Sequence, residues 1–415
     1  MPTDNRASAN SNVATAMMIY MSAQNELAQK AKENIADIKF NTILDHMCFY
    51  IVEDTYHNGR DPSLVRETFR YELPPAATEA HFVPLGGFSK EVSSPGVFNR
   101  FLAAANAHFG QGETKQKILI LWGHGGGMVM LDEDQENGIA RARASIAEFA
   151  EVLEKQKELE FDIIAFDSCY MGVIEVMNQF RQSTKFALVS STVVDADGYP
   201  YKKFIGDLRD KGPNLGPKPA ADLIADCYND HYKLLLPEED RLLFVCDMSQ
   251  IQNCAEALNL LGVEVSKLLG LDPDNDPVRD AIREALIASH ADSAYVPVLM
   301  FLRRLESRLA SLDVPPNLTQ LRKAAAALAN AVELSFSGGK LSDSGYMPTS
   351  PLIWSPDSLG IFLRDQQAYN QLDSSANGDA GWAKMWREFH GVPATMNIEM
   401  VIRPKLRLGL PKMVF

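Results

Sequence analysis

The chain has 415 residues, of which 46% are apolar, and its formal net charge is −14 at pH 7. This length and composition suffice for one large domain or two domains with a sizeable core, and they exclude global disorder. The acidic balance, without any run of Lys and Arg, argues against a nucleic-acid-binding protein. Five cysteines at irregular spacings, with no CxxC pair, indicate neither a zinc ribbon nor a disulfide framework.

The beginning of the chain shows no export or membrane signal. Met1 to Asn12 are mostly small and polar, and the apolar stretch from Ala14 to Met21 is too short to span a membrane. It also lacks the basic segment and cleavage site of a signal peptide. We therefore expect a cytoplasmic protein that binds no membrane, in a compartment where a free thiol stays reduced.

Short apolar runs alternate with helical patterns through the first two thirds of the chain. Residues 16–21 predict a strand, 26–38 an amphipathic helix, 47–52 a second strand, and 95–109 a helix that begins at a proline. Strongly apolar strands are predicted at 118–122, 162–166, 186–190 and 242–246. Apolar strands separated by helices are typical of an α/β protein with a buried, mostly parallel sheet flanked by helices on both faces.

The last third of the chain is mostly helical in pattern. We expect helices from about Pro273 to Phe336, a strand at 359–363 and a helix at 381–390. The predicted domains are a core at 1–270, a helical insertion at 271–340, and a C-terminal strand and helix at 341–415 that complete the core. Residues 272–277 are acidic and turn-rich, but their spacing does not match an EF-hand, so they indicate a helix-capping turn.

Two segments end an apolar strand in a reactive side chain. The first is Leu119-Ile-Leu-Trp-Gly-His124-Gly-Gly-Gly127, and the second is Ile163-Ile-Ala-Phe-Asp167-Ser-Cys169. In open α/β sheets, functional sites lie beyond the carboxyl ends of the strands. If the two strands are neighbours, His124 and Cys169 meet at that edge.

The two side chains have complementary chemistry. A thiolate is a nucleophile, and a nearby imidazole lowers the pKa of the thiol and carries its proton. The glycines after His124 let a substrate backbone approach, and we place an oxyanion hole at the backbone amides of Gly125 and Cys169. A cysteine at a strand end is usually only a small apolar residue and a glycine run is usually a turn, but the joint pattern favours catalysis.

Competing motifs are missing from the sequence. The His-Gly-Gly-Gly segment also occurs in lipases and esterases, which need a later G-x-S-x-G nucleophile elbow that this chain lacks. A P-loop, a G-x-G-x-x-G fingerprint and an H-E-x-x-H motif are also absent. Nucleotide-binding and zinc-protease functions therefore lose their main support.

At these residues the sequence resembles the clostripain-like cysteine peptidases, relatives of the caspases. His124 precedes Cys169 by 45 residues, and in caspases the histidine lies about 50 residues upstream of the cysteine. Weaker similarities continue at Tyr20–Leu27, Ser190–Tyr201, Gly360–Leu363 and Trp382–Phe389. The resemblance therefore covers most of the chain.

The resemblance implies a caspase-like α/β fold, a Cys–His dyad, and cleavage of protein or peptide substrates after Arg or Lys. We expect no cofactor, although part of the family requires calcium. The family's Asp two residues before the nucleophile corresponds to Asp167, and side chains two apart on an extended segment face the same way. Its carboxylate could pair with a guanidinium, or it could cap the helix that follows. Ser190, Asp195 and Asp197 are the further candidates for substrate binding.

This sequence also departs from the family's pattern. Gly123 stands where the family often has an acidic residue, and Met128 where it often has an aromatic one.

We also expect a zymogen that is activated by cleavage between the two catalytic strands. The segment from Asp132 to Gly138 is polar, and Arg141 and Arg143 lie among small residues before a helix predicted at 146–155. The enzyme itself or an upstream activating protease could make the cut. The acidic stretch Asp132–Glu136 could hold a calcium ion, but a solvated loop is the better explanation.

Two other functions stay open at this stage. The chain could be a catalytically silent caspase-like scaffold that acts by protein binding, although His124 and Cys169 argue against it. The helical region could also be a binding module whose output is the peptidase, as in a bacterial defence or death pathway. A thiol-reactive peptide probe separates the scaffold from the enzyme.

Overall fold

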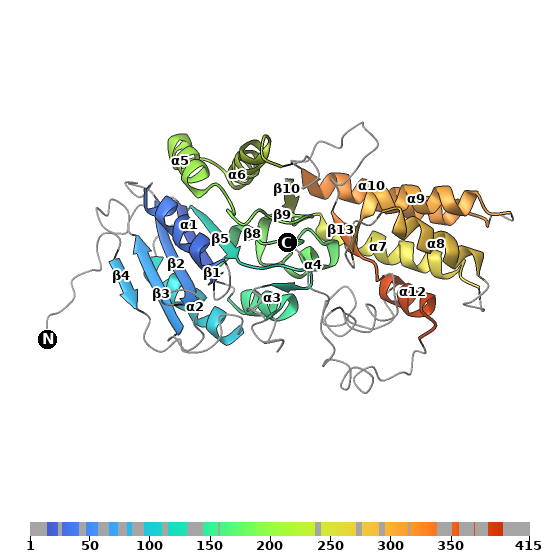
Figure 1. Ribbon diagram of the computed structural model, residues 1–415, viewed down its shortest axis with the longest axis horizontal. Helices are drawn as coiled ribbons and strands as arrows, with labels where there is room; N and C mark the ends of the chain where they lie inside the picture. Colours follow the sequence, from blue (N-terminus) through green and yellow to red (C-terminus); the bar gives the residue numbers. More distant parts are fainter. Residues whose placement is uncertain are drawn as a thin grey trace.

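The computed structural model describes residues 15–23, 27–40, 47–56, 66–73, 81–84, 95–109, 115–130, 144–156, 158–236, 242–270, 276–289, 295–313, 316–337, 351–356, 369 and 381–392. Within them the protein is built around one large sheet with helices on both faces, and further helices extend from one end of it (Figure 1). The strand order of the sheet is β12-β10-β9-β8-β5-β1-β2-β3-β4.

The centre of this sheet is parallel and its two sides are antiparallel. The consecutive strands β2, β1, β5, β8 and β9 are parallel, while β3 and β4 on one side and β10 and β12 on the other are antiparallel to their neighbours. The strands of the sheet are β1 (Thr15–Ala23), β2 (Met47–Tyr56), β3 (Arg66–Leu73), β4 (His81–Pro84), β5 (Gln116–Trp122), β8 (Phe161–Asp167), β9 (Thr184–Ser190), β10 (Leu243–Asp247) and β12 (Phe336–Ser337).

The central strands are apolar because both of their faces are covered. Along β1, Met18 and Tyr20 join the hydrophobic cluster on one face of the sheet, and Met17 and Ile19 join the cluster on the other. This alternation follows from the two-residue period of a strand. A fully buried Leu, Ile or Met side chain contributes about 1.5–3 kcal/mol, so these strands stabilise both layers at once.

The helices divide between the two faces. Helices α1 (Ala28–Phe40), α5 (Tyr201–Lys211) and α6 (Pro217–Tyr232) cover one face. The other face is covered by α2 (Pro95–Phe109), α3 (Ile146–Lys155), α4 (Ile174–Gln179) and α7 (Ile251–Ser266). Figure 1 shows α5 and α6 on the opposite side of the sheet from α3.

The C-terminal elements form a helical end that shares the core of the second face. They are α8 (Pro277–Ile287), α9 (Val298–Ala310), α10 (Thr319–Ser335) and α12 (Gly381–Phe389), with a small sheet of β11 (Tyr295–Pro297) and β13 (Leu352–Trp354). One continuous hydrophobic cluster runs from the sheet through α7 to α10 and α12. The domain boundaries given above stay a prediction.

The expected α/β class with a mostly parallel central sheet is confirmed. The strand expected at 359–363 lies outside the described residues. The antiparallel strands β3 and β4 and the small pairs β6 (Val129–Met130) with β7 (Ala144–Ser145) and β11 with β13 were not expected.

Candidate active site

The strands that carry the two sequence motifs are neighbours in the sheet. Strands β5 and β8 are parallel, with Trp122 paired to Asp167, and the Gly123 N–H donates to the Asp167 carbonyl at 3.2 Å. His124 and Cys169 each follow this last pair by two residues. The fold therefore brings residues His124 and Cys169 to the same carboxyl edge of the sheet, on neighbouring strands.

Gly125 lies directly on the backbone of the cysteine segment. A Cβ at this position would overlap the Cys169 carbonyl oxygen and would lie 2.9 Å from the Ser168 Cβ and 3.0 Å from the Cys169 nitrogen. Only a glycine fits such an approach without a shift of the backbone. The His124 segment and the Cys169 segment are thus packed backbone against backbone.

The residue after Cys169 adopts an unusual backbone conformation. Tyr170 has φ 56°, and it is the one non-glycine residue in the described parts of the chain with a positive φ. A left-handed conformation costs a residue with a side chain about 1–2 kcal/mol. Strain of this kind concentrates at functional sites, where the surrounding structure enforces it.

The thiol of Cys169 is half-buried beneath the loop that follows β9. The Val194 N–H donates to Sγ at 3.3 Å, and the thiol lies 3.8 Å from the Val194 carbonyl oxygen. Burial raises the pKa of Cys169 to about 11, the Asp167 carboxylate adds to the rise, and the Val194 N–H opposes it. In this arrangement the thiol is protonated at neutral pH, whereas the sequence predicts a pKa lowered by the imidazole.

Asp167 is buried and has no cationic partner among the described residues. Asp167 is 4% exposed. Its Oδ2 accepts hydrogen bonds from the Tyr199 N–H at 3.1 Å and from the Tyr201 hydroxyl at 2.8 Å. Burial raises its pKa to about 7, and these two donors oppose the rise. Within the described part of the chain no donor bonds Oδ1. The carboxyl therefore does not cap the helix that follows Cys169.

The other predicted substrate-binding residues lie around the same loop. Ser190 is buried, and its hydroxyl accepts from the Thr192 N–H at 3.1 Å, so it serves the turn instead of lining an open pocket. Asp195 is half-buried and accepts from the Asp197 N–H at 2.9 Å. Asp197 is exposed and forms a salt bridge with Lys30 of α1.

A surface pocket of about 630 Å³ lies on the outer side of this loop, between α1, α5 and α6. Gly198, with φ 69°, lines this pocket and packs closely on the buried carboxyl, since a Cβ at Gly198 would lie 2.9 Å from the Asp167 Oδ2 and 3.1 Å from Asn34. Asn34 accepts from the Trp122 indole N–H at 3.1 Å and donates to the Asp197 carbonyl at 3.1 Å. Helix α1 thereby fixes the loop to the strand that carries His124.

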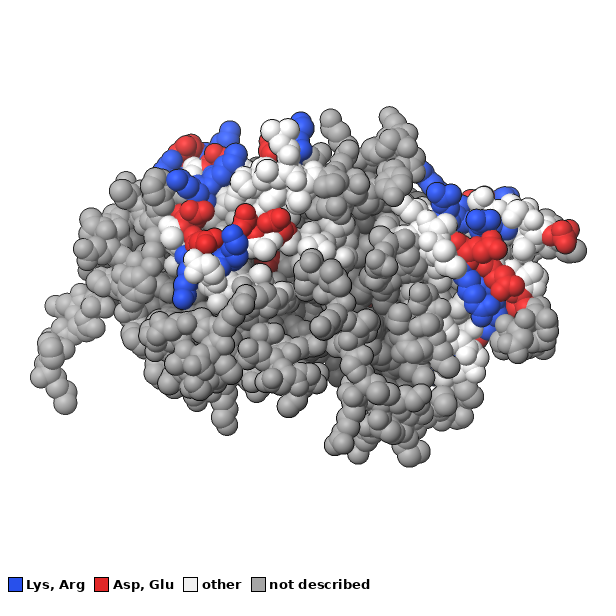
Figure 2. All heavy atoms as spheres, in the orientation of Figure 1, with Lys and Arg blue, Asp and Glu red and all other residues white. Residues whose placement is uncertain are grey.

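Charged side chains of both signs surround this pocket. On the face that Figure 2 shows, Lys, Arg, Asp and Glu side chains mix over the α1 and α5 side of the molecule and again at its helical end. Lys30, Glu33, Asp37 and Asp197 are among the residues that line the pocket. The electrostatic potential of the pocket is therefore neither uniformly positive nor uniformly negative.

Several predicted features lie outside the described residues. Arg141, Arg143 and the acidic stretch Asp132–Glu136 belong to segment 131–143, whose two ends are joined by the antiparallel pair β6 and β7. Within the described ranges, no group of three His, Cys, Asp or Glu side chains could hold a metal ion. The same ranges contain no helix long and apolar enough to cross a membrane.

Sequence reasoning missed the residues that hold the thiol and Asp167. Val194 and Tyr199 reach the site from the loop after β9, and Tyr201 reaches it from the start of α5. Asn34 of α1 links that loop to Trp122. The one signal for them was the Gly198-Tyr-Pro-Tyr201 segment, which the resemblance included without giving it a role.

A parallel sheet that ends two neighbouring strands in a histidine and a cysteine is the framework of a cysteine peptidase. The family model described as the clostripain family matches residues 87–295, half of the chain, and this range contains both segments. The chain belongs to the clostripain family of cysteine peptidases. Among curated proteins, no relative matches the chain.

Solved structures share the fold at low sequence identity. An inactive zymogen C11 protease from Parabacteroides distasonis is 17% identical with a TM-score of 0.60, covering 91% of this chain and 99% of its own. A secreted C11 cysteine protease from Bacteroides thetaiotaomicron, in complex with an irreversible peptide inhibitor, is 16% identical with a TM-score of 0.58, covering 88% and 99%. A second structure of a secreted C11 cysteine protease from that organism, called iotapain, is 14% identical with a TM-score of 0.56, covering 90% and 99%.

Proposed function

We propose that this peptidase cleaves proteins or peptides after Arg or Lys with a Cys169–His124 dyad. The main support for the dyad is the register of β5 and β8. Trp122 pairs with Asp167, so His124 and Cys169 each lie two residues beyond the end of the paired strands. The packing of Gly125 on the Cys169 backbone supports a shared oxyanion hole made by the N–H groups of these two residues.

The proposed chemistry needs no cofactor. His124 takes the proton of the Cys169 thiol, and the sulfur attacks the carbonyl carbon of the scissile bond. The amide C–N bond then breaks, and the imidazolium gives its proton to the leaving amine. Water hydrolyses the resulting thioester with His124 as the base, which returns the free thiol.

Asp167 supports the preference for a basic P1 side chain. It is a buried carboxyl two residues before the nucleophile, with one oxygen unbonded within the described ranges. A guanidinium or ammonium group would supply the missing positive charge and would lower the pKa of the carboxyl. A neutral or acidic P1 side chain would leave this carboxyl uncompensated. Asp195 lies on the loop above it and adds negative charge nearby.

The covered thiol supports activation by processing. With Sγ held against Val194 and a pKa of about 11, Cys169 is not a thiolate in the uncut chain at neutral pH. Cleavage at Arg141 or Arg143, by the enzyme itself or by an upstream protease, would cut segment 131–143. Strand β6, two and three residues beyond the glycine run, holds one end of this segment, and β7, directly before α3, holds the other. Mass spectrometry of the purified wild type and of Cys169→Ala identifies the cleavage site. Fragments in the wild type alone indicate self-processing, and fragments in both indicate another protease.

A screen of fluorogenic peptides that differ only at P1 tests the proposed specificity, with and without calcium. We expect turnover of Arg and Lys peptides and none of Asp peptides. A preference for acidic P1 residues would refute the proposal. The cytoplasmic location and the role in bacterial defence stay predictions.

A further inference from the structure

The glycine run after His124 needs anchors from outside its own sequence. Glycine loses more conformational freedom on folding than any other residue, so three glycines in a row hold no fixed shape by themselves. Gly127 has φ 72°, in the left-handed region. Yet catalysis requires His124 and the Gly125 N–H to be held to within a fraction of an ångström.

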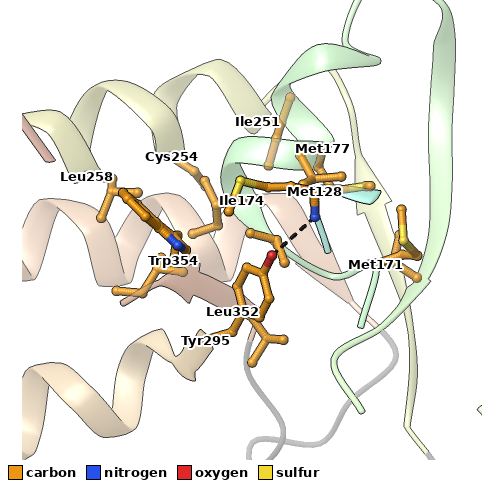
Figure 3. Packing of buried hydrophobic residues seen from close by; sticks show 14 of the residues in the cluster. Met128, Met171, Ile174, Met177, Ile251, Cys254, Leu258, Tyr295, Leu352 and Trp354 are labelled. Carbon is orange, nitrogen blue, oxygen red and sulfur yellow. Dashed lines mark hydrogen bonds between the residues drawn. The ribbon is translucent and has the colours of Figure 1, made fainter. Parts of the chain in front are cut away.

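Tyr295 of β11 supplies such an anchor. Its hydroxyl accepts from the Met128 N–H at 3.2 Å, the dashed line in Figure 3. The same hydroxyl donates to the Gly126 carbonyl at 3.1 Å, so one oxygen joins both neighbours of Gly127. The phenol ring lies against Gly127, where a Cβ would overlap it. The Tyr295 residue is 9% exposed, which protects both hydrogen bonds from competition with water.

The same small sheet also contacts the nucleophile segment. Tyr295 pairs with Trp354 in the β11–β13 sheet. Leu352 of β13 donates its N–H to the Gly172 carbonyl at 2.8 Å and forms a bridge with Val173. Gly127 and Gly172 each lie three residues after a member of the proposed dyad. One two-stranded unit therefore contacts both catalytic segments.

We propose that Tyr295 is a positioning residue, which holds the loop after His124 in register with Cys169 through the β11–β13 sheet. This inference rests on the proposed dyad. Tyr295 itself does not touch the reacting atoms; its hydroxyl fixes the backbone from Gly126 to Met128, and that backbone fixes His124 and the Gly125 N–H. Removal of the hydroxyl should lower turnover and leave substrate binding unchanged.

Tyr295→Phe is the test, with Tyr369→Phe as the matched control. Both changes remove one buried phenol hydroxyl, and the Tyr369 hydroxyl donates to Glu175 of α4 at 3.4 Å. Thermal unfolding of both variants gives the loss of stability that each change causes. Activity is then measured at a temperature well below the lower of the two unfolding midpoints, with a peptide that the wild type cleaves.

We expect Tyr295→Phe to lower kcat about tenfold, with KM within about twofold of wild type, as for an interaction that acts on the transition state. Tyr369→Phe should keep kcat within about twofold. Equal losses in the two variants, or a kcat for Tyr295→Phe close to wild type, would overturn the inference.

Hydrogen exchange separates this inference from the proposed dyad. The Met128 amide donates to Tyr295, so backbone amides at 123–130 should exchange faster in Tyr295→Phe and stay unchanged in Tyr369→Phe. This readout needs no activity, so it decides about the anchor even if the wild type cleaves no peptide. Unchanged exchange in Tyr295→Phe would show that the anchor does not exist.

Discussion

Two buried carboxyl groups lie on either side of the nucleophile in the chain, and burial affects them in the same way. Asp167 and Glu175 are 4% and 1% exposed, and burial raises the pKa of each to about 7. They differ in their surroundings. Asp167 lies under the loop that covers the thiol, while Glu175 accepts from the Trp354 N–H at 3.2 Å and the Tyr369 hydroxyl, within the core beneath α4.

For Asp167 we predict that substitution by Asn removes the preference of the enzyme for a positively charged P1 side chain. Asp167→Asn keeps an oxygen that can accept from Tyr199 and Tyr201, so the fold should persist. Turnover of Arg peptides should fall at least tenfold, while peptides with the neutral isostere citrulline should be affected little. In the wild type the ratio of kcat/KM for Arg peptides to kcat/KM for citrulline peptides should rise from pH 6 to pH 8, because the carboxyl of the free enzyme ionises at about pH 7.

The variant provides the control for that pH dependence. In Asp167→Asn the ratio of Arg to citrulline turnover should be flat across the same range. If the ratio of Arg to citrulline turnover were the same in the wild type and the variant at every pH, Asp167 would have no role in substrate recognition.

For Glu175 we predict an effect on the pH dependence of stability. The folded chain keeps this proton up to about pH 7, whereas the unfolded chain loses it near 4.5, so the folded state binds more protons between these values. Stability contributed by this group therefore falls as pH rises from about 4.5 to 7 and is constant above. Glu175→Gln cannot titrate and should remove part of that fall, on the order of a few kcal/mol. Chemical denaturation at pH 5 and pH 7.5 measures it; equal pH slopes in the two proteins would contradict the account.

At the scale of elements, the site depends on two loops that approach each other after β5 and β8. The glycines of the first loop are not equivalent. A Cβ at Gly125 would overlap the Cys169 backbone, while a Cβ at Gly126 would meet nothing closer than the Val129 Cγ2 at 3.5 Å, an ordinary contact. The contact between the loops is therefore made at Gly125.

We predict that Gly125→Ala loses at least a hundredfold in kcat/KM, because the added methyl group separates the two catalytic segments. Gly126→Ala adds the same group to the same loop and should keep most of the activity. Steady-state kinetics on the two purified variants decide, with circular dichroism to show that both are folded. Comparable losses in both would mean that general loop stiffness matters, and not the approach of Gly125 to Cys169.

Some helices and strands could be predicted from the sequence and others could not. The central strands and α2, α3 and α12 were predictable because their apolar periods are long and unbroken, and the reactive residues were predictable because they stand at the ends of such strands. The strands β11 and β13 were not predictable, since each has three residues and they are far apart in the chain. Nor could local sequence reveal that Tyr170 takes a positive φ, or that Val194 would hold the thiol.

At the scale of the whole molecule, a cut in segment 131–143 would divide the sheet between two chains. Strands β1, β2 and β5 would belong to one chain and β8, β9 and β10 to the other, with β5 paired to β8 from Ile118 to Trp122. Both hydrophobic clusters contain residues from either side of the cut.

We therefore predict that the processed peptidase stays together as a two-chain complex. The two fragments should separate on a denaturing gel and should elute as one species of about 46 kDa in gel filtration, the mass of the whole chain at 45.9 kDa. An Arg141→Ala/Arg143→Ala variant should remain a single chain under both conditions. Elution of separate fragments without denaturant would contradict the continuous core described above.

The most direct test of the central claim is the site of covalent labelling by a thiol-reactive peptide with Arg at P1. The account predicts one adduct on the processed wild type, at Cys169, with no labelling of Cys169→Ala. Labelling of His124→Ala should be slowed about 10²–10⁴-fold, as expected for loss of a general base. Cys227, Cys246 and Cys254 are buried free thiols and serve as internal controls. An adduct on any of the four other cysteines, or equal labelling of wild type and Cys169→Ala, would contradict the assignment of Cys169 as the nucleophile.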